Sequence, residues 1–181
     1  MGDTTANNNV AADDDSVVDP ATGLTLRQKN LIIQSWEIIG SRQTQKKNGV
    51  QLFLDLFTAY PDQQGFFPLF HDKSVEELAT SSKMRAHATT VMYQIGSLVS
   101  NLDDPECLVA LIEKVANNHL KRGIRMKEFE ELRTMFIPFL KKSLGDEATP
   151  ALLEAWDKLL AVMNTVVLGV AKEQGLLNDA T

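Results

Sequence analysis

Cysteine is nearly absent from this chain of 181 residues, and Cys107 is the only one. A single cysteine cannot form an intramolecular disulfide, so the sequence favours a protein of the reducing cytoplasm. The N-terminus shows neither the basic segment nor the apolar segment of a secretory signal. The most apolar run, residues 165–171, is far too short to span a bilayer. A secreted protein and a membrane-spanning protein are therefore both disfavoured.

Basic side chains are missing from the first part of the chain. Residues 1–24 hold five of the 24 acidic residues and no base, which accounts for most of the net charge of −6. The rest of the chain is close to neutral and shows no basic stripe of the kind that binds phosphate groups. The charge pattern therefore argues against a nucleic-acid partner.

Residues 1–23 also lack hydrophobic periodicity and are rich in Asn, Asp, Thr and Ala. This composition predicts a disordered acidic extension, followed by one folded domain over residues 24–176 and a short tail over 177–181. The chain begins Met1-Gly2, but Ala6 stands where an N-myristoylation motif requires Ser or Thr. The sequence therefore argues against a lipid anchor at Gly2.

Apolar residues recur at helical spacing through the folded domain, and no run alternates as a strand would. Thr25 and Ser74 begin capping boxes, and Thr149 precedes a proline suited to a first helical turn. Gly49, inside a helical pattern, predicts close packing, and Pro138 predicts a bend. Seven or eight helices are expected, with starts near residues 25, 44, 74, 82, 105, 126 and 150. The fold class is all-α.

The chain has only three histidines, His71, His87 and His119, and none has the spacing of a zinc site. His119 ends an apolar stripe with Leu108 and Val115, and His87 begins a similar stripe on another helix. Two such stripes suit a site that sandwiches a flat apolar group. They also suit two core histidines hydrogen-bonded to the backbone. Periodicity leaves both interpretations open.

Over residues 24–176 the sequence resembles the globin family. Trp36 stands in the opening helix, Pro61 follows the second helix, and Phe67 lies six residues beyond that proline, as in globins. Residues 86–91, around His87, resemble the distal-histidine segment, and residues 117–124, around His119, resemble the proximal-histidine segment. The latter stretch, with Asn-Leu-Asp at 101–103, is most similar to intracellular globins of molluscs and other invertebrates.

The resemblance implies a globin fold around haem b, with His119 as the proximal iron ligand. It implies that the second ring nitrogen of His119 donates to a main-chain oxygen near Val115. His87 would face a bound gas or act as a sixth iron ligand. His71, Lys121, Arg122 and Arg125 are weaker candidates for contact with the haem propionates. The remaining pocket residues, each also suited to plain core packing, are Phe53, Phe67, Phe70, Val91, Val115, Ile124, Phe129 and Met163.

The function that this resemblance implies is reversible binding of oxygen, and of other diatomic gases, for storage or transport inside cells. It does not imply an enzyme. The alternative is a six-coordinate globin with a redox, signalling or nitric oxide dioxygenase role, although the chain carries no fused reductase segment. A haem-free globin fold used for interaction is a third class. Similar invertebrate globins often pair, which leaves a homodimer open.

Overall fold

The structure, a computed structural model, describes residues 17–176, and within this range it is all-α with no strand. Val18 and Thr25 form one isolated bridge. None of the helices in the described range is both long enough and apolar enough to cross a membrane. The elements are α1 (Leu26–Ile39), α2 (Gln45–Ala59), the 3-10 helix η1 (Pro61–Phe66), α3 (Val75–Thr80), α4 (Ser82–Val99), α5 (Pro105–Leu120), α6 (Met126–Leu144), the 3-10 helix η2 (Gly145–Glu147) and α7 (Pro150–Glu173). The prediction of an all-α fold is confirmed.

The helix starts lie where the sequence placed them, because side chains satisfy the free amides of the first turns. At α1 the Thr25 hydroxyl accepts from the Gln28 amide at 3.2 Å, and the Gln28 side chain accepts from the Thr25 amide at 3.1 Å. Ser74 and Glu77 form the same reciprocal pair at α3. Both predicted capping boxes are therefore confirmed.

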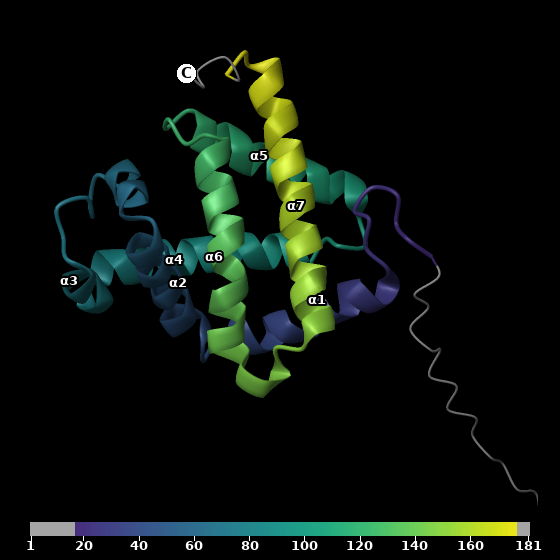
Figure 1. Ribbon diagram of the computed structural model, residues 1–181, viewed down its shortest axis with the longest axis horizontal. Helices are drawn as coiled ribbons and strands as arrows, with labels where there is room; N and C mark the ends of the chain where they lie inside the picture. The colour runs from purple at the N-terminus through teal and green to yellow at the C-terminus, as the bar shows by residue number, and fades with distance from the viewer. Residues whose placement is uncertain (1–16, 177–181) are drawn as a thin grey trace, which may run out of the picture.

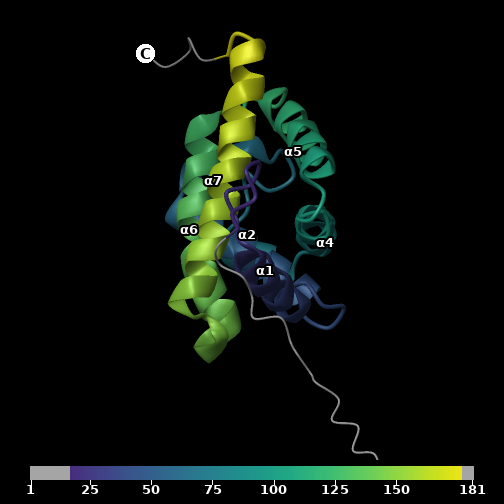
Figure 2. The same cartoon turned by 90° about the vertical axis from the view of Figure 1, so that its right-hand side faces the viewer.

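The helices form two layers. α6 and α7 run side by side in Figures 1 and 2, and they contact each other along their length. α4 and α5 run across behind this pair in Figure 1 and lie to the right of it in Figure 2. α2 packs on α4, α5 packs on α7, and α1 crosses near the start of α7. The two layers bring α4 and α5, which carry His87 and His119, to the same side of α6 and α7.

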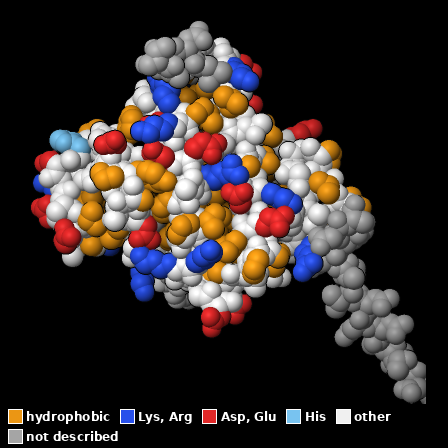
Figure 3. All heavy atoms as spheres, in the orientation of Figure 1, with side chains coloured by type: hydrophobic (Ala, Val, Ile, Leu, Met, Phe, Trp, Pro, Cys, Tyr) orange, Lys and Arg blue, Asp and Glu red, His pale blue; other side chains and the backbone are white. Residues whose placement is uncertain are grey.

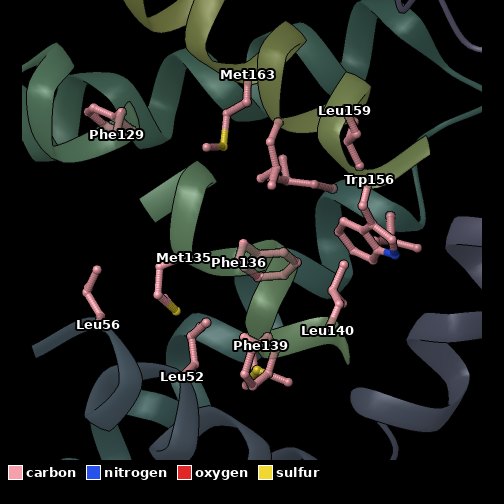
Figure 4. Close-up of a cluster of buried hydrophobic side chains, with 14 of the residues drawn as sticks. Leu52, Leu56, Phe129, Met135, Phe136, Phe139, Leu140, Trp156, Leu159 and Met163 are labelled. Carbon is pink, nitrogen blue, oxygen red and sulfur yellow. The ribbon is translucent and has the colours of Figure 1, made fainter. Parts of the chain in front are cut away.

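The core joins three helices through aromatic rings (Figure 4). The Trp156 ring of α7 lies 5.2 Å from Phe136 of α6 and 6.0 Å from Trp36 of α1. Trp156 is 1% exposed, so its indole N–H needs an internal acceptor. Its Nε1 donates to the Ser35 hydroxyl at 2.9 Å, and Ser35 donates to the Ile32 carbonyl at 2.8 Å. This chain of hydrogen bonds explains why a serine is buried in α1.

α2 and α4 cross closely at Gly49. A Cβ atom at this position would stand 2.8 Å from Met92 Cγ and 3.0 Å from the Ala88 carbonyl oxygen. Met92 and Ala88 are both buried in α4. The absence of a side chain at Gly49 therefore lets the two helices touch, and the predicted packing reason for this glycine is confirmed.

Pro138 does not interrupt α6, which is one continuous helix from Met126 to Leu144. Proline has no amide hydrogen and leaves the carbonyl of the residue four before it, here Thr134, without a helical partner. Both Pro138 and Thr134 are exposed, so the freed carbonyl belongs to the outer side of the helix. The expected bend therefore does not divide the helix.

Residues 17–25 fold back onto the start of α1. The Asp19 amide donates to the Leu24 carbonyl at 2.9 Å, and the Asp19 carboxylate pairs with Lys29 Nζ. Leu24 is fully buried. The sequence placed residues 17–23 in the acidic extension, but their hydrogen bonds join them to the folded part of the chain. Residues 1–16 of that extension, including Gly2, and the predicted tail over 177–181 lie outside the described residues.

On the face drawn in Figure 3, acidic and basic side chains are intermixed and no single-sign patch dominates. Cross-helix ion pairs contribute to this pattern, such as the two-pronged contact of Arg133 with Asp157 at 2.8 Å. The Arg133 guanidinium holds the pKa of Asp157 below its usual range. This ion pair links α6 to α7 at the surface.

We expect Gly49→Ala to destabilise the protein. The added Cβ would force Ala88 or Met92 aside, and overpacking of this kind typically costs about 1–3 kcal/mol. Alanine favours a helix over glycine by about 1 kcal/mol, so the expected net loss in the free energy of unfolding reaches up to about 2 kcal/mol. Urea denaturation followed by circular dichroism measures this value.

Gly169→Ala in α7 is the matched control. Gly169 is exposed and no atom lies within 4 Å of the position its Cβ would take. This variant should gain up to about 1 kcal/mol from helix propensity alone. A Gly49→Ala protein that is as stable as the Gly169→Ala protein would show that the α2–α4 crossing is not tight.

Candidate functional site

His119 lies in the last turn of α5, with its ring half-buried. Its Nδ1 stands 2.8 Å from the Val115 carbonyl oxygen, one helical turn back. A carbonyl only accepts hydrogen bonds, so Nδ1 carries the proton and Nε2 keeps its lone pair in the neutral ring. The hydrogen bond to Val115 that the resemblance implied is therefore present. It fixes both the tautomer and the angle of the ring.

His87 lies in the first half of α4 and is surrounded by aromatic rings. Its ring centroid is 4.9 Å from Phe53, 5.4 Å from Phe67 and 5.8 Å from Phe70. Phe53 comes from α2, whereas Phe67 and Phe70 follow η1. Within residues 17–176 the His87 ring makes no hydrogen bond, and its ring contacts are with these three phenylalanines.

Burial and nearby charges lower the pKa of both imidazoles. Burial lowers the pKa of His87, and the charges of His119 and Arg122 lower it further. Burial also lowers the pKa of His119, with Arg122 acting in the same direction and the bond to Val115 opposing it. Both rings are therefore neutral at pH 7. A neutral imidazole can ligate a metal through its unprotonated nitrogen and can still donate one hydrogen bond through the other. An imidazolium has no free lone pair and cannot ligate a metal.

The structure gathers most of the predicted pocket residues around one or other histidine. Phe53, Phe67 and Phe70 contact the His87 ring. On the other side, Val115 accepts the hydrogen bond of His119, and the Phe129 ring lies 5.6 Å from the His119 ring. The remaining three, Val91, Ile124 and Met163, lie in the core or pack against it.

The candidates for contact with the haem propionates differ in their exposure and in the hydrogen bonds that their side chains already make. His71 and Lys121 are exposed. Arg122 is also exposed, and its guanidinium donates to the Asn118 carbonyl while its charge reaches both imidazoles. Arg125 is half-buried, and its guanidinium donates to the Leu120 and Ile124 carbonyls at 3.0 and 3.2 Å. Its hydrogen bonds therefore go to the backbone near His119.

Gln63 contributes to the site and was missed from the sequence. It lies in η1, is buried, and donates to the Glu128 carbonyl at 3.2 Å and to the Glu131 carboxylate at 2.8 Å. These bonds tie the corner that carries Phe67 to the first turns of α6. Gln63 can be buried because it bonds to residues 65 and 68 positions further along the chain. No pattern in the neighbouring sequence could therefore indicate it.

The side chains near the two histidines suit a metal that is already coordinated by a prosthetic group. His119 Nε2 offers a single lone pair, and the residues beside both histidines are mainly aromatic or aliphatic. In the described range no three His, Cys, Asp or Glu side chains gather as a metal cluster. One imidazole among apolar side chains fits a flat, largely apolar prosthetic group whose metal lacks one ligand.

Comparisons with known proteins agree with this chemistry. A family model described as Globin matches residues 50–167. The chain is 35% identical over 142 residues to a globin of Tritia mutabilis, which covers 78% of this chain and 97% of that protein. It is 35% identical over 153 residues to Globin-1 of Anadara inaequivalvis, covering 84% of this chain and 99% of the relative. Hemoglobin-3 of Phacoides pectinatus is 33% identical over 155 residues, covering 85% and 99%.

Among solved structures, a double mutant of the myoglobin from Aplysia limacina superposes with a TM-score of 0.72 at 25% identity. The match covers 79% of this chain and 95% of that protein. The shared arrangement therefore extends over nearly the whole of the described helical domain.

The histidine pKa values predict how the stability of the haem-free protein depends on pH. An unfolded histidine has a pKa near 6.5, above the lowered values of folded His87 and His119. The unfolded state therefore binds more protons below about pH 7, and the free energy of unfolding should fall as the pH drops. Each histidine contributes a slope of at most about 1.4 kcal/mol per pH unit.

Urea denaturation between pH 7.5 and 5.5 measures this slope. His87→Gln and His119→Gln should each flatten it, and His71→Gln, which alters an exposed side chain, is the matched control. A slope that survives both of the first two substitutions would contradict this assignment.

Proposed function

The chain belongs to the globin family, and we propose that it is a haem protein that binds oxygen reversibly for storage or transport inside cells. Its relatives include gastropod and bivalve globins, as the sequence indicated. Family membership implies a haem cofactor and an oxygen ligand, and globins are typically oxygen carriers rather than enzymes. The observation that supports the proposal most directly is the 2.8 Å contact between His119 Nδ1 and the Val115 carbonyl oxygen.

We assign the proximal ligand to His119. Its Nε2 lone pair is free because Nδ1 donates to Val115. This hydrogen bond also increases the electron density on the ring, which makes Nε2 a better ligand. His119 would hold the iron of haem, and when bound this group would supply the reversible binding of a diatomic gas.

We assign the distal position to His87. A neutral ring can donate one hydrogen bond towards a gas on that side of the site. Phe53, Phe67 and Phe70 make the surroundings apolar, and a hydrogen bond is electrostatically stronger in such surroundings than in water. His87 would thereby favour oxygen over the less polar carbon monoxide.

The remaining pocket residues would exclude water and hold the flat group. Phe53, Phe67 and Val91 suit the distal wall, and Phe67 would stack on the porphyrin. Phe70, Val115, Ile124, Phe129 and Met163 complete the proposed cofactor contacts. The proposed domain begins near residue 24, and residues 17–23 pack onto its first helix.

The alternative is a six-coordinate globin with a redox or signalling role, in which His87 itself ligates the metal. One observation favours it: the His87 ring makes no hydrogen bond within residues 17–176. Packing against phenylalanine rings alone would permit the ring to move towards the haem. Storage or transport remains our first proposal, because it requires no such movement.

The absorption spectrum of the deoxygenated ferrous protein tests the choice between these two functions. A single broad five-coordinate band is expected for an oxygen carrier. Split six-coordinate bands would overturn this and favour the redox role.

Two substitutions test the assigned residues. His119→Ala should abolish stoichiometric haem incorporation, since it removes the proposed iron ligand. His87→Leu should retain haem but release oxygen about tenfold faster or more, because it loses one hydrogen bond to a partly charged ligand. His71→Leu is the matched control. Full pigment content in His119→Ala would refute the ligand assignment.

A further inference from the structure

We propose that Arg125 is a positioning residue for His119: its guanidinium holds the last turn of α5 while its backbone amide is held by the first turn of α6, and together these bonds fix the orientation of the proximal imidazole. This inference rests on the proposed function, because it concerns the ring that would ligate the haem iron. Arg125 would not touch the haem. It would act through the backbone that carries His119.

The position of His119 makes such support necessary. α5 ends at Leu120, one residue beyond His119. The last four carbonyls of a helix have no partner within the helix, and terminal turns open more readily than central ones. An imidazole in this turn therefore depends on whatever occupies those carbonyls.

Arg125 occupies the carbonyl next to His119. Its Nη1 donates to the Leu120 oxygen at 3.0 Å and to the Ile124 oxygen at 3.2 Å. A cation at a helix C-terminus also interacts favourably with the negative end of the helix dipole. The guanidinium thus closes the end of α5 by a hydrogen bond and by its charge.

The same residue begins α6. Its backbone is extended, with φ −124° and ψ −176°, and its amide donates to the Glu128 carboxylate at 2.8 Å. Arg125 is therefore held by the first turn of α6 while its side chain reaches back to α5. Because α6 lies in the other layer of the fold, Arg125 connects the end of α5 to that layer.

The loop between these helices transmits the constraint to His119. The His119 carbonyl accepts from the Arg122 amide at 2.9 Å and from the Ile124 amide at 3.3 Å. Gly123 adopts φ +85°, a left-handed conformation that favours glycine, and its amide donates to Leu120 at 3.1 Å. The loop therefore closes on His119 and Leu120, and Arg125 secures its far end.

Arg122 does not perform the same task. Its guanidinium donates to the Asn118 carbonyl, but it is exposed and links only residues of the same helix end. Arg125 alone of these two arginines spans from α5 to α6 by its hydrogen bonds.

The test compares Arg125→Met, which keeps the length but not the donors, with Arg85→Met. Arg85 of α4 is a matched control, because its Nη1 caps the Thr80 carbonyl at the end of α3 at 2.8 Å, away from His119. For each variant we would measure amide hydrogen exchange of the haem-free protein and the iron–histidine stretching band of the deoxygenated ferrous protein.

We expect Arg125→Met to bind haem but to broaden and shift the iron–histidine band. Amides from Lys121 to Ile124 should exchange about tenfold faster, the change expected for the loss of one charged hydrogen bond. Arg125→Lys, which keeps a cation, should fall between Arg125→Met and the wild type in both measurements. It also tests the proposal if Arg125→Met does not fold. Arg85→Met should leave both measurements at wild-type values in this region.

Wild-type band and exchange rates in Arg125→Met would overturn the inference, as would an equal broadening in Arg85→Met. Failure of the proposed function has a different signature, because the wild type itself would then either lack pigment or show split six-coordinate bands instead of an iron–histidine band. The exchange comparison in the haem-free protein separates the two outcomes.

Discussion

The Val115 carbonyl decides what the His119 side of the candidate site can do. By accepting from His119 Nδ1 at 2.8 Å, it leaves the lone pair on Nε2 and fixes the plane of the ring. A free imidazole exchanges between two tautomers, and only one of them presents a ligand atom in a given direction. The packing of α5 on α7, the turn at Gly123 and the contacts of Arg125 all hold the backbone that makes this hydrogen bond possible.

On the His87 side of the candidate site the constraint is the close crossing of α2 and α4. Gly49 lets α2 approach until its missing Cβ would meet Ala88 and Met92. This approach brings Phe53, four residues along α2, against His87, one residue before Ala88. A wider crossing would separate the two rings and admit water. The apolar surroundings and the lowered pKa of His87 thus follow from a small residue that touches neither ring.

Local chemistry accounts for what could be predicted from the sequence. Capping boxes bond within three residues, so Thr25 and Ser74 marked helix starts correctly. Pro138 was expected to bend α6; α6 runs on through it, because an exposed proline leaves its freed carbonyl on the outer side of the helix. Gln63 went unnoticed, because its partners Glu128 and Glu131 lie on a helix far along the chain.

The sequence by itself determined the helices, their starts, and the stripe positions of His87 and His119, because these depend on neighbours a few residues apart. It left open whether the two histidines were ligands or plain core residues. Only the tertiary structure decided which rings surround His87, that residues 17–23 join the folded domain, and that Arg125 spans from α5 to α6. Such contacts depend on how helices cross, and a crossing is set by the packing of the whole core rather than by any local pattern.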